Sequence, residues 1–399
     1  MTDQRDFSSR APWSATPNRL SEAVLARRIA GKTILDLTVS NPTRAGFQYP
    51  RAELCDALRE ASTHPYDPTP LGLDATRQAV ATFLSTDEDV VDAEDIVITA
   101  STSEGYGFLF KLLCEPGDAV LTHAPEYPLL DHLAGLEGVR LRRFPLEYLA
   151  GSRRPWRVDP DEIRRHMSDD LGAIVMIHPN NPTGSYLQKE EMEAVCEIAA
   201  GGIALISDEV FADYALGDDG RAGSAAAETL GLAFSLGGLS KSAGLPHWKI
   251  GWIRIGGDPL LRVRARSALE VIGDSYLSVS TPTQVAAITA LKHAPGIRGQ
   301  ITSRLLSNLT AIRAIADATP PIECLPVGGG WSVVLRVPAI ATDEELALEL
   351  LESAGILVHP GYLFEFDREG FLVLSLLTPP EIFREGASRL AEHVAARIR

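Results

Sequence analysis

The chain has 399 residues, of which 45% are hydrophobic and 23% are charged, a composition typical of a globular protein long enough for two domains. Its formal net charge of −16 repels polyanions, which excludes nucleic acid as an expected partner. The N-terminus is polar, which disfavours export, and no run of about 18 apolar residues occurs, which disfavours membrane insertion. The four cysteines are widely spaced, which disfavours a cysteine-based metal site. Together these features favour the cytoplasm.

Short β-rich runs alternate with amphipathic helical stretches through the middle of the chain. Such alternation is typical of strands connected by helices, and it predicts an α/β domain with a mostly parallel sheet. Ligands of such a sheet bind beyond the carboxyl ends of its strands. The runs that we identify as strands are DIVITA (95–100), AVLTHAP (119–125), GAIVMIHP (172–179), GIALISDEVF (202–211), LAFSLGG (232–238) and WIRIGG (252–257).

A hydroxyl-rich turn follows the first of these strands. Thr102 and Ser103 open a helix that continues through residues 107–113. Exposed backbone amides and the positive end of the helix dipole make this turn a natural phosphate site. Capping of the helix by Thr102 or Ser103 is an equally good interpretation.

Three further strands end close to a residue that could carry chemistry. Tyr127 follows the second run, Asn181 follows the third, and Asp208 comes near the end of the fourth. Taken singly, Tyr127 also fits an aromatic ring packed in the core, and Asn181 also fits a turn. Asp208 also fits a carboxylate that needs a partner if it is buried. Their shared position at strand ends makes them candidates for one site.

Lys241 lies in the stretch GGLSKSAGLPHWKIGW (237–252). A phosphate-binding P-loop needs glycine directly before the lysine and another glycine five residues before that, where this chain has Ser240 and Ser235. The alternative is that the ε-amine itself is the nucleophile and forms a Schiff base with an aldehyde cofactor.

The last third of the chain predicts a second, α+β unit. A long helix from Pro282 is expected to break near Pro295 and Gly296 and to resume over 300–317, because proline interrupts helical hydrogen bonding. A strand over 328–338, a helix closed by a glycine and a strand over 371–377 follow.

The order of these motifs resembles the class I/II aminotransferases, a pyridoxal-phosphate-dependent family of fold type I. The resemblance covers most of the chain. It rests on AsnProThrGly at 181–184, AspGluValPhe at 208–211, SerLysSer around Lys241, TrpLysIleGlyTrp at 248–252, ThrProThrGln at 281–284 and HisProGly at 359–361.

The resemblance implies a domain organisation as well as a fold. The large domain would be α/β with a mixed, mostly parallel seven-stranded sheet, and the smaller domain would be α+β. Residues 1–45 would form an N-terminal arm that contributes to the small domain and to the mouth of the active site. Residues 46–285 would form the large cofactor-binding domain, and residues 286–399 the small domain with its linking helix.

The resemblance further implies roles around pyridoxal 5′-phosphate. Lys241 would form the Schiff base and then move the substrate's proton, while Asp208 would face the ring nitrogen. Asn181 would donate to the phenolic oxygen of the ring and border the substrate, and Tyr127 would stack on the ring. Removal of the charge of Asp208 should cost several kcal/mol of stabilisation.

The cofactor's phosphate would be held by a second group of residues. Thr102 and Ser103 would bind it at the helix N-terminus, and Ser240 would compensate for Gly238, where the family usually has serine. Lys249 stands where the family usually has arginine, and it would supply a point charge without the bidentate geometry. Tyr66 would reach the phosphate of a neighbouring subunit, which implies a homodimer with shared active sites.

The substrate end departs from the family. Val373 stands where relatives that bind amino acids have an arginine for the substrate carboxylate, and Arg44 in the N-terminal segment is the candidate replacement. Phe211 occupies a place where the family often has tyrosine. Tyr276 replaces an arginine of the aspartate-specific relatives, so a dicarboxylic donor is not indicated.

The expected function is therefore amino transfer from an amino acid to a 2-oxo acid by ping-pong chemistry through Lys241. The alternative keeps the cofactor but makes the protein a lyase, a decarboxylase or an amine transaminase whose substrate lacks the usual carboxylate. A regulator that senses the cofactor is disfavoured, because the family-like region starts near Ile34 and leaves no room for a DNA-binding domain.

Overall fold

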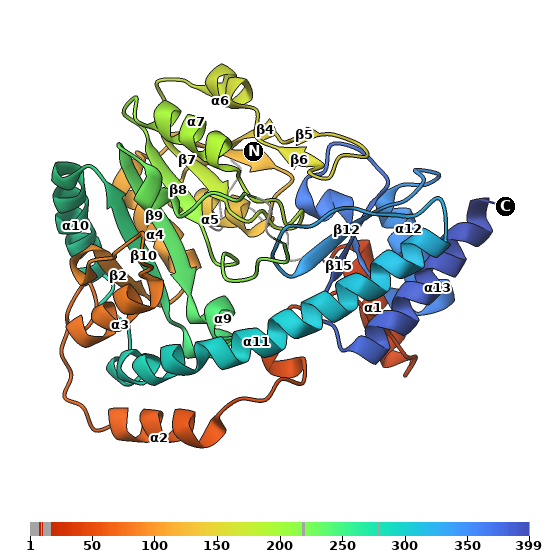
Figure 1. Cartoon of the computed structure of the whole chain (residues 1–399), viewed down its shortest axis with the longest axis horizontal. Coiled ribbons are helices and arrows are strands. Elements are labelled where there is room, and N and C mark those ends of the chain that lie inside the picture. Colours follow the sequence, from red (N-terminus) through yellow and green to blue (C-terminus); the bar gives the residue numbers. More distant parts are fainter. Residues whose placement is uncertain (1–7, 9, 11–16, 218–219, 278, 399) are drawn as a thin grey trace, which may run out of the picture.

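A seven-stranded sheet forms the centre of the larger part of the molecule (Figure 1). The computed structural model describes residues 8, 10, 17–217, 220–277 and 279–398. The strand order is β2-β10-β9-β8-β7-β3-β4, in which β10 runs antiparallel to both neighbours and the other pairs are parallel. This confirms the predicted mixed, mostly parallel sheet. The strands are β2 (Ile96–Thr99), β3 (Ala119–Ala124), β4 (Arg140–Pro145), β7 (Leu171–Ile177), β8 (Ala204–Asp208), β9 (Leu232–Gly238) and β10 (Gly251–Gly257).

Strand β4 was not among the six runs identified from the sequence. It reads RLRRFP and lies at the edge of the sheet, with only Phe144 fully buried. The arginines reach carboxylates outside the strand, including Asp170 and the buried Glu126, so the strand needs no apolar alternation. Edge strands that carry charged side chains are common, and they hide the pattern on which strand prediction depends.

Helices cover both faces of this sheet. Val175 in β7 belongs to the core with α4 (Thr102–Leu113), α5 (Leu129–Glu137) and α10 (Pro259–Asp274), whereas Ile174 and Met176 pack on the other face with α6 (Pro160–His166) and α7 (Lys189–Ala199). This alternation is the period of two that a strand imposes. The remaining elements of this part are α2 (Arg51–Ala61), α3 (Asp74–Leu84), β5 (Glu147–Tyr148), β6 (Trp156–Arg157), α8 (Ala225–Glu228) and α9 (Leu239–Ser242).

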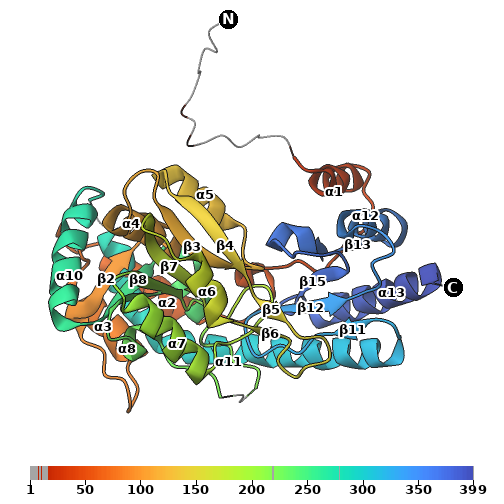
Figure 2. The same cartoon turned by 90° about the horizontal axis from the view of Figure 1, so that it is seen from above.

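A four-stranded sheet of order β11-β12-β15-β14 organises the C-terminal unit. The N-terminal segment joins this unit, because β1 (Leu35–Asp36) pairs in parallel with β13 (Ile356–Leu357) and α1 (Arg19–Ile29) lies beside α12 (Asp343–Glu349) (Figure 2). The elements of the unit are β11 (Glu323–Cys324), β12 (Ser332–Arg336), β14 (His359–Pro360), β15 (Phe371–Ser375) and α13 (Pro380–Ile398).

Helix α11 (Thr281–Ala318) connects the two parts without interruption, so the predicted break near Pro295 and Gly296 is wrong (Figure 1). The buried side chains before the proline, up to Ala294, belong to the core under the large sheet. Those from Ile297 onward belong to the core of the C-terminal unit. Burial on both sides offsets the roughly 3 kcal/mol that an internal proline costs a helix.

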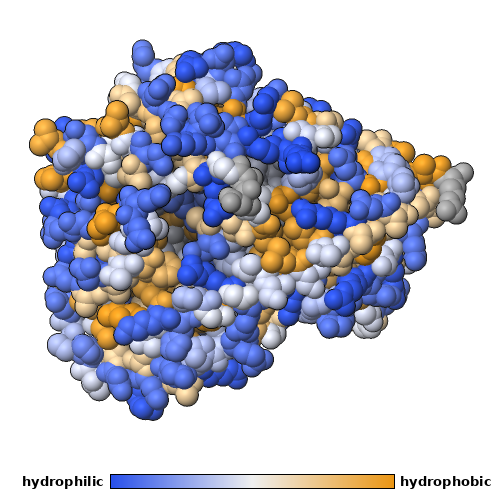
Figure 3. All heavy atoms as spheres, viewed as in Figure 1, coloured by the Kyte–Doolittle hydropathy of each residue, from blue (hydrophilic) through white to orange (hydrophobic). Residues whose placement is uncertain are grey.

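Polar side chains cover most of the face seen in Figure 3, and apolar side chains form separate patches between them. Within the described residues, no helix has the length and apolar character needed to cross a membrane. The same residues contain no cluster of histidine, cysteine and acidic side chains arranged to hold a metal ion.

Candidate active site

A cavity of about 420 Å³ lies beyond the carboxyl ends of the parallel strands, where the C-terminal unit and the N-terminal segment meet the large sheet. Sites of this volume bind small molecules and cofactors. The cavity brings together most of the residues that the sequence predicted, although they come from five separate segments. They are Thr102, Ser103, Tyr127, Asn181, Asp208, Ser240 and Lys241.

Lys241 is carried by the short turn α9, directly after β9. Tight packing demands glycine in this strand, because a Cβ at Gly237 would lie 2.3 Å from the indole nitrogen of Trp252. The hydroxyl of Tyr214 donates to the carbonyl of Lys241 at 2.6 Å and holds the turn. Phe211, which neighbours the amine of Lys241, stands where the family often has tyrosine. Tyr214 does not supply the missing hydroxyl, because its own hydroxyl donates to the backbone carbonyl of Lys241.

Aromatic rings surround the amine of Lys241. Its Nζ lies 4.6 Å from the ring centre of Trp331 and 5.0 Å from that of Phe211. Burial lowers the pKa of this amine to about 8, and the carboxylate of Asp208 opposes the shift. A larger fraction of the amine is therefore in the free-base form that attacks an aldehyde.

This lowered pKa predicts a pH profile for the amine. In cofactor-free protein, the rate of borohydride trapping of Lys241 with an aldehyde should rise with a midpoint near pH 8, not at the ordinary 10.5. The pKa is lower in the folded state, so the unfolded chain binds more protons between these values and stability should increase with pH across that interval. Mass spectrometry of the trapped peptide measures the rate, and Lys241→Ala gives the background; a midpoint near 10.5 would contradict the assignment.

Asp208 ends β8 and faces the cavity. Tyr106 donates its hydroxyl to Oδ2 at 3.0 Å, and the backbone N–H of Val210 donates to Oδ1 at 3.2 Å. Burial raises the pKa of Asp208, while these two hydrogen bonds act in the opposite direction. Sequence reasoning missed Tyr106, although it lies four residues after Thr102 and hence one helical turn along the same face.

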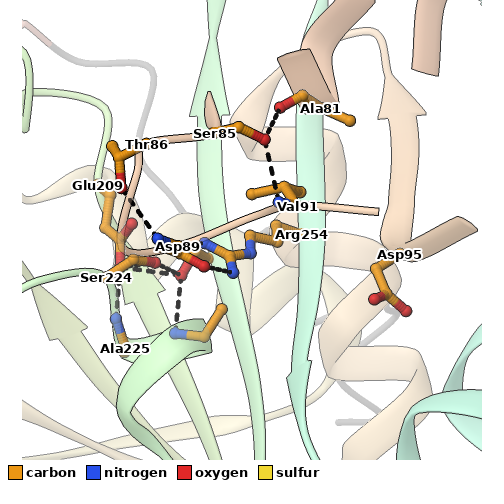
Figure 4. A network of polar contacts seen from close by, with 12 residues as sticks. Ala81, Ser85, Thr86, Asp89, Val91, Asp95, Glu209, Ser224, Ala225 and Arg254 are labelled. Atoms are coloured by element: carbon orange, nitrogen blue, oxygen red, sulfur yellow. Dashed lines mark hydrogen bonds and ion pairs between the residues drawn. The ribbon is translucent and has the colours of Figure 1, made fainter. Parts of the chain in front are cut away.

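Glu209, the second member of the acidic pair, does not line the cavity, and its side chain lies beside Ser224 and Ala225 (Figure 4). Consecutive residues at the end of a strand face opposite sides of the sheet, which separates the two carboxylates. Glu209 is part of a structural network, and burial raises its pKa while its hydrogen bonds oppose the shift. Its Oε1 accepts from the Ser235 hydroxyl at 2.8 Å, the Ala225 N–H at 3.0 Å and the Ser224 hydroxyl at 3.1 Å.

We expect Glu209→Ala to lower the free energy of unfolding by about 2–4 kcal/mol, because two buried donors, on Ser235 and Ala225, and the partly buried hydroxyl of Ser224 lose their acceptor. Glu209→Gln keeps an acceptor and should lose about 1 kcal/mol. Denaturant midpoints measure both changes, with Glu190→Ala on the exposed face of α7 as the matched control. Equal midpoints for Glu209→Ala and Glu190→Ala would show that the network is unimportant.

The two consecutive asparagines have different roles. Asn180 is buried, and its side chain donates to the Pro125 carbonyl at 2.9 Å and accepts from the backbone N–H of Thr183 at 2.9 Å, so it fixes the turn. Asn181 lines the cavity, and its amide has no hydrogen-bond partner within the described part of the chain. Its amide is therefore available to a ligand.

The hydroxyl turn at the start of α4 is also available. Ser101, not Thr102 or Ser103, caps the helix, with its Oγ accepting from the N–H of Glu104 at 3.1 Å. The capping interpretation of Thr102 and Ser103 is thus wrong, and both line the cavity at the positive end of a 12-residue helix. Such an end attracts anions.

Three of the sequence-predicted residues do not line the cavity of this chain. Lys249 is exposed. It lies two residues before Gly251, and a Cβ added to Gly251 would come within 2.9 Å of the backbone nitrogen of Thr102. The backbone next to Lys249 is therefore close to the hydroxyl turn. Tyr66 is 69% exposed. Arg44 is exposed at the end of the turn η1 (Pro42–Arg44). The roles given to these three residues stay predictions.

Comparison with known proteins identifies relatives over nearly the whole length. The family described as aminotransferase class I and II matches residues 32–390. Glutamate-pyruvate aminotransferase AlaA of Escherichia coli (strain K12) is 28% identical over 370 residues, which are 90% of this chain and 88% of that protein. Tyrosine aminotransferase of Homo sapiens is 22% identical over 406 residues, 96% of this chain and 88% of that protein. The solved structure of an alanine aminotransferase from Pyrococcus furiosus superimposes with a TM-score of 0.86 at 25% identity, covering 98% of this chain and 100% of that one.

Proposed function

The chain belongs to the class I and II aminotransferases, and from this premise we propose that it transfers an amino group from a small donor to an oxo acceptor through pyridoxal 5′-phosphate on Lys241. The observation that carries the proposal is the placement of Lys241 and Asp208 in one cavity. The amine is buried with a lowered pKa, and the carboxylate is held by Tyr106 and lies close enough to influence that amine.

The described residues fit this cofactor. Phosphate suits the start of α4, where Thr102 and Ser103 offer amides and hydroxyls. The amide of Asn181 has no protein partner, and Tyr127 offers a half-exposed ring at the cavity wall. The carboxylate of Asp208, which is partly buried at the cavity wall, is available for a cationic ring nitrogen.

When bound, the cofactor supplies an aldehyde for the amine and a ring that accepts electrons. Lys241 provides the attacking Nζ and, once displaced by the donor's amine, can carry the proton at the reacting carbon. Asp208 stabilises positive charge beside it, and Tyr106 holds the Oδ2 atom of that carboxylate. The rings of Phe211 and Trp331 lie close to Nζ and limit its hydration.

The visible spectrum of the purified protein tests the proposal. Addition of an amino donor should shift the absorption of the lysine-bound cofactor to that of its amine form, and an oxo acceptor should restore it. Persistence of the first spectrum while another product accumulates would instead support the second candidate, a lyase or decarboxylase.

A specific observation favours a substrate without the usual carboxylate. Val373 is 1% exposed and lines the cavity, and Arg44 lies outside it. An amine transaminase is therefore the second form of the proposed function. Transfer from an amino acid requires a carboxylate site other than these two positions.

We also propose a homodimer in the cytoplasm. Tyr66 is exposed, which suits a residue that acts in a neighbouring subunit, and exposed apolar side chains such as Leu260 and Leu277 are available for an interface. All four cysteines are free thiols, as is usual in a reducing compartment.

A further inference from the structure

The charge of the cavity constrains the substrate. Among the described residues that line it, Lys241 is the one lysine or arginine, and its amine is committed to chemistry in the proposed function. The other ionisable groups on the wall are Asp208, His359 and the phenols of Tyr106 and Tyr127. A substrate carboxylate would lose its hydration here without gaining a dedicated cation, which costs several kcal/mol.

His359 and Val373 form a cross-strand pair on this wall. His359 in β14 is the direct register partner of Val373 in β15, and both line the cavity. Directly opposed residues of an antiparallel pair have Cβ atoms about 4.5–5.5 Å apart. The imidazole is therefore the polar group beside the apolar Val373, and its ring packs edge-on against Phe364 at 5.8 Å.

Some other polar groups of the cavity wall have hydrogen-bond partners within the protein, and others have none among the described residues. The hydroxyls of Thr38 and Ser375 donate within the protein, to Asp36 Oδ1 at 2.6 Å and to the carbonyl of Val39 at 2.5 Å. Neither ring nitrogen of His359 has a hydrogen-bond partner in the portion of the chain that is described, and the same holds for the hydroxyls of Ser332 and Ser40. An unpartnered imidazole and two hydroxyls thus remain for a ligand.

We propose that His359 is a specificity-determining residue, and that it selects substrates whose reacting carbon carries an uncharged hydrogen-bonding group, such as a hydroxymethyl or a carboxamide, in place of a carboxylate. This inference rests on the proposed aminotransferase function. Burial lowers the pKa of His359 and Asp36 opposes the shift, so the ring at neutral pH is a neutral donor and acceptor. The amino carbon of the donor becomes a ketone and its nitrogen passes to the oxo acceptor, so the exchange needs no oxidant.

Matched donors test this inference on the cofactor-loaded protein. Each of two series keeps the side chain constant, and the side chains are apolar because the cavity wall is rich in apolar residues. The first series is leucinol, leucinamide, leucine and isopentylamine, and the second consists of the corresponding phenylalanine compounds. The alcohol or amide of at least one series should change the cofactor spectrum at concentrations at least 10-fold below those of the amino acid and the simple amine. Calorimetry of the same compounds with cofactor-free protein gives a binding order that does not depend on turnover.

Variants at His359 identify the cause. His359→Phe should remove the 10-fold advantage of the alcohol over the simple amine, His359→Asn should retain part of this advantage, and His359→Arg should favour the amino acid. The exposed His64→Phe is the matched control. Preference for the amino acid in the unaltered protein, no binding of any neutral compound, or an unchanged ratio in His359→Phe would overturn the inference. If the spectrum never changes but calorimetry shows the predicted order, transamination fails and the role of His359 stands.

Discussion

Lys241→Ala is expected to abolish the covalent link to the cofactor and to reduce turnover by at least about 10³-fold. The reason is that the nucleophile and the proton carrier are the same Nζ, and within the described part of the cavity no second lysine lines the wall. Borohydride reduction followed by mass spectrometry measures the link, and steady-state rates measure turnover. The protein should still fold, because alanine removes a chain whose charged form is disfavoured by burial.

Lys292→Ala, on an exposed position of α11, is the matched control and should keep both the link and the rate. A Lys241→Ala protein that still forms a reducible link and turns over would refute the assignment of the nucleophile. Loss of the link with turnover retained would show that Lys241 only anchors the cofactor.

Asp208→Asn should lower kcat/KM by about 10²–10³-fold, which corresponds to about 3–4 kcal/mol of lost stabilisation. The substitution keeps the shape and an acceptor for the Tyr106 hydroxyl but removes the negative charge from the buried site. Rates with one donor at saturating acceptor measure the effect. The pKa of Lys241 should also fall further, because Asp208 is the charge that raises it.

Tyr106→Phe distinguishes the effect of the negative charge of Asp208 from the effect of how that carboxylate is oriented. It retains the carboxylate and removes one hydrogen bond to it, so a loss of about 10-fold is expected. If Tyr106→Phe were as damaging as Asp208→Asn, orientation rather than charge would be the main contribution of the pair. If Asp208→Asn were fully active, the carboxylate would have no part in the chemistry.

The residues nearest the chemistry could be predicted because each follows a strand. Asp208, Asn181 and Tyr127 come from different parallel strands whose carboxyl ends meet at one edge, so local sequence was enough to group them. Their order along the chain matches a family, and the resemblance added Lys241 as the proposed reacting amine. Tyr106 was missed because its contact with Asp208 depends on how α4 packs against β8.

Other errors arose where tertiary packing outweighs local preference. Pro295 predicts a helix end, yet α11 continues because both of its halves are buried against different cores. Strand β4 carries arginines whose partners lie elsewhere in the chain. In each case the stabilising contacts are distant in sequence, and a periodicity search cannot detect them.

The sequence by itself predicted the fold class and grouped Asp208 with the other candidates at strand ends, because strand alternation and residues at strand ends are local patterns. The resemblance to the family added Lys241 as the proposed reacting lysine. Only the tertiary structure decided what surrounds them. The docking of the C-terminal unit on the large sheet places Trp331, His359 and Val373 on the wall of the cavity that holds Lys241, and Arg44 is not part of that wall. Burial and the neighbours it brings set the lowered pKa of Lys241, and burial exists only after the two units have packed together.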